Sequence, residues 1–108
     1  MKKSSLPAPS YDWPALAWEA HFQSRELAPR AGMDPRTLRR RFHREFGTTP
    51  QRWLEALRMK LAKKLLRSKK SVKAVAYELF FKQPSHFCRR FKQAHGLPAQ
   101  AWQRTNGQ

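Results

Sequence analysis

The chain has few of the residues on which enzymes and secreted proteins commonly depend. It contains one cysteine, Cys88, so no disulfide can form within it, and a reducing compartment fits this usage. The four histidines have no metal-ligand spacing, and no carboxylate pair is placed for acid–base chemistry. A glycine-rich phosphate loop is also missing. These absences argue against an enzyme, and we expect neither a metal nor a cofactor.

Long apolar runs are missing as well. No stretch is apolar enough to span a bilayer, so we expect no membrane partner. The first three residues resemble the start of an export signal, but SLPAPS follows them in place of an apolar run. We therefore expect no export signal and a cytoplasmic location.

Acidic residues are scarce. The 108 residues include 7 Asp and Glu against 23 Lys and Arg, which gives a formal net charge of +16. Such an excess indicates a polyanionic partner, with the phosphate backbone of nucleic acid first and an anionic membrane surface second. The length allows one small domain with a modest core, or two very small domains that share an element.

One stretch of twenty residues occurs twice. Asp34–Trp53 returns without a gap as Gln83–Trp102. The identical pairs are Pro35/Pro84, Arg40/Arg89, Arg41/Arg90, Phe42/Phe91, Gly47/Gly96, Gln51/Gln100 and Trp53/Trp102. The chain is therefore predicted to use one supersecondary unit twice.

Each copy is predicted to contain a helix that begins at a proline and ends at a glycine. Asp34 suits an N-cap, and the proline after it fits the first helical turn. Gly47 and Gly96 can adopt the left-handed conformation that ends helices. Leu38 and Phe42 lie four residues apart, which places one apolar stripe opposite a cationic face.

Apolar residues at helical spacing predict further helices, and no segment alternates for long enough to be a strand. We expect an all-α fold of about seven helices, with two helix-turn-helix subdomains joined by a long linker helix. The predicted segments are a disordered tail 1–11, a first subdomain 12–48, a linker helix 49–67, a second subdomain 68–104 and a tail 105–108.

The linker helix is predicted to have two stripes. Its apolar stripe consists of Leu54, Leu57, Leu61 and Leu65. Its basic stripe, expected to be solvated or in weak contact with phosphates, consists of Lys60, Lys63, Lys64 and Arg67. Arg58 is expected to be structural, with Glu55 or another acid as its partner. Helical spacing also predicts that six aromatic residues are core and do not form a stacking platform: Trp13, Trp53, Trp102, Phe42, Phe46 and Phe91.

Four segments carry a family pattern: LAPRAGMDPRTLRRRF (27–42), FGTTPQRWL (46–54), LRMKLAKKLL (57–66) and VAYELFFKQPSHFCRRFKQAHGLPAQAW (75–102). Over residues 20–104 the chain resembles the DNA-binding domain of the AraC/XylS family of bacterial transcription regulators. The resemblance implies a bilobed domain whose two recognition helices enter successive major-groove segments, ~34 Å apart. A linker helix of ~27 Å is compatible with that separation.

The resemblance also implies which side chains contact DNA. Base contacts fall to Arg36, Arg39 and Arg40 in the first recognition helix and to Ser85, His86 and Arg89 in the second. Because the arginine fork matches guanine O6 and N7, we expect a G-rich first half-site. Phosphate contacts are expected from Thr37, Arg41, His43, Arg44, Lys82, Arg90 and Lys92. Arg41 and Arg90 lie near the core-facing side, where acidic side chains are alternative partners.

Two positions depart from what a helix-turn-helix prefers. The family usually has glycine where this chain has Phe80, and a positive φ there would cost ~1–2 kcal/mol. Pro29 falls inside a predicted helix, where it removes a hydrogen bond at ~3 kcal/mol or more unless the helix bends. Both predict altered geometry near the turns.

Two functions of different classes stay open. One is a sequence-specific regulator that binds double-stranded DNA in the bacterial nucleoid and for which a monomer is sufficient. The resemblance implies an activator that contacts RNA polymerase. The other is a basic protein that coats nucleic acid or anionic surfaces without regard to sequence. The chain lacks room for an effector-sensing domain, so it is either a stand-alone regulator or a domain of a longer protein.

Overall fold

The fold is all-helical, as predicted. The computed structural model describes residues 11–106, and most of the predicted tail 1–11 lies outside this range. Within the described range there are seven helices and no strand. They are α1 (Trp13–Glu19), α2 (Ser24–Arg30), α3 (Pro35–Phe46), α4 (Pro50–Arg67), α5 (Val72–Glu78), α6 (Pro84–His95) and α7 (Ala99–Asn106). Since α7 ends at Asn106, the predicted tail 105–108 begins inside a helix.

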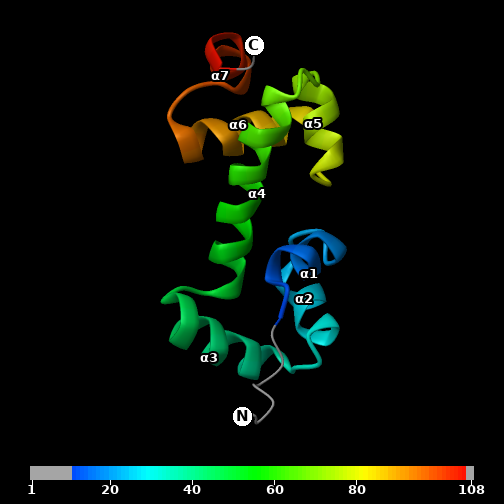
Figure 1. Ribbon diagram of the computed structural model, residues 1–108, viewed down its shortest axis with the longest axis vertical. Coiled ribbons are helices and arrows are strands. Elements are labelled where there is room, and N and C mark those ends of the chain that lie inside the picture. Colours follow the sequence, from blue (N-terminus) through cyan, green and yellow to red (C-terminus); the bar gives the residue numbers. More distant parts are fainter. Residues whose placement is uncertain (1–10, 107–108) are drawn as a thin grey trace, which may run out of the picture.

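The long helix α4 organises the molecule. In Figure 1 it stands upright, with α1, α2 and α3 gathered at its N-terminal end and α5, α6 and α7 at its C-terminal end. We call these sets the N-terminal and C-terminal helix groups. Helix α3 lies below the N-terminal end of α4, whereas α6 crosses α4 near its C-terminal end, and both run across the view in the same direction (Figure 1). The 18 residues of α4 span ~27 Å.

The predicted start and end of α3 are confirmed. The Asp34 carboxylate accepts a hydrogen bond of 2.7 Å from the backbone N–H of Thr37. At the other end Gly47 has a φ of +68°, and Gly96 ends α6 with a φ of +85°. The two repeated helices therefore have the same length and the same kind of C-terminus.

We expect the Asp34 cap to make stability depend on pH. The hydrogen bond from the Thr37 backbone N–H holds the pKa of the Asp34 carboxyl below its usual value. A pKa lowered by folding stabilises the protein above the unfolded value of ~3.9, and this stabilisation is lost as the pH falls through the folded pKa. Urea midpoints measured from pH 6 to pH 2 should fall less steeply for Asp34→Asn, which keeps a cap that does not titrate. Identical pH profiles would contradict this.

The first helix-turn-helix turn closes on a glycine. Gly32 has a φ of +71°, and the next residue, Met33, donates its backbone N–H to the carbonyl oxygen of Ala28 at 2.9 Å. This is the usual left-handed helix ending. Pro29 is exposed in the last turn of α2, and the helix continues past it to Arg30.

The second turn has the same ending without a glycine. Phe80 has a φ of +69°, and Phe81 donates its backbone N–H to the carbonyl oxygen of Ala76 at 3.0 Å. The expected strain is present, since a left-handed residue with a side chain costs ~1–2 kcal/mol. The second turn is also longer, with residues 79–83 between its helices against 31–34 in the first.

The buried face of α4 differs from the predicted stripe. Leu54 is buried as expected, whereas Leu57, Leu61 and Leu65 are only half-buried. The other buried residues of this helix are Pro50, Met59, Ala62 and Leu66. The buried side turns around the helix axis because different helices pack at its two ends. A single continuous core results, to which both helix groups contribute.

Two further predictions about packing were wrong in part. Phe46 is 40% exposed and Trp53 is half-buried, because both lie at the edge of the cluster around the fully buried Phe42. The basic stripe of α4 is solvated at Lys60, Lys64 and Arg67, as predicted, whereas Lys63 is half-buried. Lys63 and Arg67 lie over the ring of Trp102 in α7, at 5.7 and 5.4 Å from its centroid.

Candidate nucleic-acid interface

Helix α3 presents a cationic face to solvent. Its apolar residues Leu38 and Phe42 are buried, at 1% and 0% exposure, which turns the opposite side outward. Every predicted base-contacting residue of this helix is exposed: Arg36, Arg39 and Arg40. Of its predicted phosphate contacts, His43 and Arg44 are also exposed, whereas Thr37 is half-buried beside the N-cap.

Helix α6 has the same construction. Phe87 and Phe91 are fully buried. The predicted base-contacting residues Ser85, His86 and Arg89 are exposed, as are the predicted phosphate contacts Lys82 and Lys92. The His86 ring meets the Phe81 ring edge to face, with centroids 5.3 Å apart. This contact restricts the direction in which His86 points from the start of α6.

Arg41 and Arg90 each lie beside a carboxylate. Nε of Arg41 is 2.7 Å from a carboxylate oxygen of Glu45, an ion pair without hydrogen-bond geometry. Arg90 donates from Nε to Glu55 Oε2 at 2.9 Å, and its Nη2 lies 2.8 Å from the same oxygen. A DNA phosphate would compete with these partners, so the freely exposed cations are better placed to bind it.

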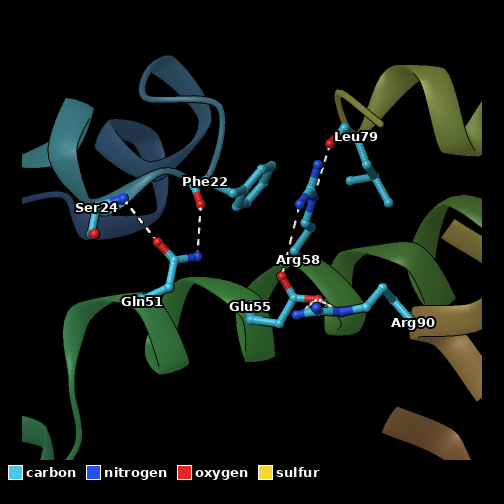
Figure 2. A network of polar contacts seen from close by, with 7 residues as sticks. All are labelled: Phe22, Ser24, Gln51, Glu55, Arg58, Leu79 and Arg90. Atoms are coloured by element: carbon cyan, nitrogen blue, oxygen red, sulfur yellow. Dashed lines mark hydrogen bonds and ion pairs between the residues drawn. The ribbon is translucent and has the colours of Figure 1, made fainter. Parts of the chain in front are cut away.

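One polar side chain of α4, that of Gln51, holds the loop between α1 and α2 in place. The Gln51 side chain accepts a hydrogen bond of 3.1 Å from the Ser24 backbone N–H and donates one of 3.3 Å to the Phe22 carbonyl oxygen (Figure 2). The sequence pattern does not predict this role for Gln51. A signal was present, because Gln51 is one of the seven residues that the two copies of the repeat share.

Arg58 is structural, as expected, and reaches the turn before α6. Its Nε donates to the Leu79 carbonyl oxygen at 3.0 Å, and its guanidinium lies 3.7 Å from the centroid of the Phe81 ring. Glu55 lies between this guanidinium, at 3.8 Å, and that of Arg90 (Figure 2). Burial lowers the pKa of Arg58, and the nearby Glu55 opposes that shift. Arg58 stays charged, because an arginine does not lose its proton in proteins.

Metal-binding clusters and membrane-spanning helices are absent from the part of the chain that the structure describes. Among residues 11–106, no three His, Cys, Asp or Glu side chains are grouped to hold a metal ion. None of the described helices combines the length and apolar character needed to cross a membrane. The structure presents two exposed cationic helix faces, on α3 and α6, near the two ends of α4.

Comparison with known proteins agrees with this arrangement. Residues 27–105 match the family profile described as "Helix-turn-helix domain". The HTH-type transcriptional activator RhaS of Escherichia fergusonii is 37% identical over 83 residues, which cover 76% of this chain and 28% of RhaS. RhaS of Escherichia coli O139:H28 is 39% identical over 83 residues, covering 71% and 30%. The chain thus spans less than a third of these relatives. No solved structure matches it.

Proposed function

Because the chain belongs to the AraC/XylS family of helix-turn-helix transcription regulators, we propose that it binds double-stranded DNA sequence-specifically and regulates transcription, as an activator. The relatives named above are transcriptional activators, and activation is proposed here on that basis. RNA polymerase is the proposed protein partner, and the bacterial nucleoid is the proposed place of action.

In the proposed complex, α3 and α6 enter two successive major-groove segments of one duplex. Arg36, Arg39 and Arg40 contact base edges in the first segment. Ser85, His86 and Arg89 contact those in the second. Neighbouring cations and Thr37 contact phosphates, which supply most of the affinity. One monomer carries both helices, so a second copy is not required.

One observation carries the proposal. All six side chains proposed to contact bases are exposed, and within residues 11–106 none of them forms an ion pair. The arginines closer to the core, Arg41 and Arg90, do have carboxylate partners. Free donors gathered on the outward faces of two helices are what base contacts require, because a paired guanidinium would first have to lose its partner.

Selection from randomised duplexes tests this proposal. We expect an enriched site with two segments about one helical turn apart, and a G-rich first segment. Competition with random duplex at matched salt should favour the selected site by well over tenfold. A preference of less than about tenfold would support the sequence-indifferent coating protein, since specific complexes are typically ~10³-fold or more tighter than non-specific ones. A first segment of A·T pairs alone would refute the assignment of the α3 arginines.

We expect Arg89→Ala to relax the preference at one base pair. A bidentate arginine–guanine pair contributes ~1–3 kcal/mol of discrimination, so the selected base and its alternatives should bind nearly alike. The matched control is Lys92→Ala on the same helix, which should weaken all sequences equally. Binding measured on four duplexes that differ at that base pair separates the two effects. Equal, sequence-blind losses from both substitutions would show that Arg89 does not contact a base.

A further inference from the structure

Besides α4, an aromatic contact connects the two helix groups. The ring of Phe80, in the turn that leads into α6, stacks on the ring of His21, in the turn that follows α1. Their centroids are 3.9 Å apart, and the rings are 11° from parallel. Trp18 meets Phe80 edge-on at 5.3 Å, and Phe22 lies 6.1 Å away. We call Trp18, His21, Phe22 and Phe80 the aromatic junction.

Backbone strain is concentrated at this junction. Within residues 11–106 four residues other than glycine have a positive φ, and three of them are His21 at +53°, Phe22 at +61° and Phe80 at +69°. Glycine would adopt these angles freely, whereas residues with side chains adopt them rarely. Such strain persists only where the surrounding structure enforces it. Here it lies on both sides of one contact, which indicates that the contact itself has a role.

Arg58 supports the same contact from α4. Its guanidinium lies 3.7 Å from the Phe81 ring centroid and 5.6 Å from that of Phe22. It also donates to the Leu79 carbonyl oxygen, next to Phe80. Figure 2 shows Arg58 reaching from α4 to the space between Phe22 and Leu79, which belong to different helix groups. One charged side chain therefore touches both turns that form the junction.

The aromatic junction fixes the rotation of the two helix groups about the axis of α4, which α4 alone does not fix. A single helix sets the separation of the groups at its ends, but it does not by itself hold each group at one rotation about its axis. The turns that hold His21 and Phe80 lie beside α4 (Figure 1), and Phe80 belongs to the turn 79–83 that leads into α6. A change in that stack would therefore change the direction of α6 relative to α3.

We propose that Phe80, supported by His21 and Arg58, is a positioning residue that makes the protein select DNA sites by the spacing between their two half-sites. This inference rests on the proposed function, because it requires α3 and α6 to bind one duplex together. The proposed function concerns which bases the protein contacts. The present inference adds the distance that must separate the two half-sites. Rigidly linked modules bind strongly only when the separation of their sites matches their own.

A spacing series tests the inference. Duplexes carry the selected half-sites with one or two base pairs added or removed between them. Wild type should lose about tenfold or more at a shift of two base pairs, because one helix then misses its base contacts. Phe80→Gly should lose about tenfold on the selected spacing and show a profile flat to within about threefold. On a duplex with one half-site it should match wild type.

Two substitutions distinguish a change in the position of α6 from a loss of folding. Glycine suits the positive φ, so Phe80→Gly removes the ring without adding strain to the turn. Phe80→Tyr keeps the ring and should restore the wild-type spacing profile.

Without DNA, spin labels at Ala15→Cys in α1 and Gln100→Cys in α7, in a Cys88→Ala background, report the distance between the two helix groups. That distribution should be narrow with Phe80 and broad with glycine.

The outcomes separate the two proposals. If wild type shows no preference for a two-segment site over random duplex, the proposed function fails. If wild type discriminates spacing and Phe80→Gly keeps the same profile and a narrow distance distribution, the function stands and the positioning role is overturned. An equal loss on every duplex, including the single half-site, would also overturn it, since a role in stability alone predicts that result.

Discussion

Raising the salt concentration from 50 to 200 mM should weaken binding to the selected duplex by about 10³-fold. Each cation that neutralises a phosphate releases counterions from the duplex, and this release becomes less favourable as salt is added. Six of the proposed phosphate contacts are basic side chains, of which Arg41 and Arg90 must exchange a carboxylate partner for the phosphate: Arg41, His43, Arg44, Lys82, Arg90 and Lys92. Six contacts lie at the lower end of the range for which losses of ~10³ to 10⁵ are typical.

Fluorescence anisotropy titrations across a salt series give the number of these contacts directly. The slope of log K against log salt should be about −5, which corresponds to six phosphates at −0.9 each. Lys92→Ala should make that slope shallower by about one. A slope close to zero would mean that the cationic faces of α3 and α6 do not lie against the phosphate backbone.

The second large effect should come from Phe42→Ala. This ring is fully buried in α3, with the rings of Trp13 and Trp53 at 4.8 and 5.4 Å between centroids. Truncating a buried phenylalanine lowers the free energy of unfolding by ~3–5 kcal/mol. A domain of this size is stable by only ~5–15 kcal/mol, so the melting temperature should fall by about 12 °C or more. Thermal denaturation followed by circular dichroism measures the shift.

The same substitution tests whether the core is one unit. Because the buried residues of both helix groups form one cluster, amide signals of α3 and α6 should disappear together on heating. Persistence of the α6 signals after α3 has melted would show that the groups unfold separately. Phe46→Ala is the control, since that ring is 40% exposed and its loss should have a much smaller effect.

The elements of this fold could be predicted because their signals are local. Asp34 and Gly47 mark the two ends of α3 through their own chemistry, and the structure places the N-cap hydrogen bond and the positive φ there. The four-residue spacing of Leu38 and Phe42 is enough to define the buried side of α3. Once that side is known, the outward position of Arg39 follows.

Contacts between distant residues could not be predicted in this way. Glu55 pairs with Arg90, and His21 stacks on Phe80, but nothing in local spacing links either pair. The half-burial of Leu57 was missed for a related reason, since the helices that cover each part of α4 come from elsewhere in the chain. The strain at Phe80 was anticipated only because the resemblance to a family shows which residue usually occupies that turn.

The hydrogen bonds that Gln51 and Arg58 make to the two inter-helix loops have a thermodynamic consequence. Through them the loops next to Phe22 and Leu79 lose their conformational freedom when the protein folds. Binding to a partner then requires a smaller loss of conformational entropy, so less of the favourable contact energy is offset by ordering the chain. The two loops are therefore already ordered in the free protein, before a partner binds.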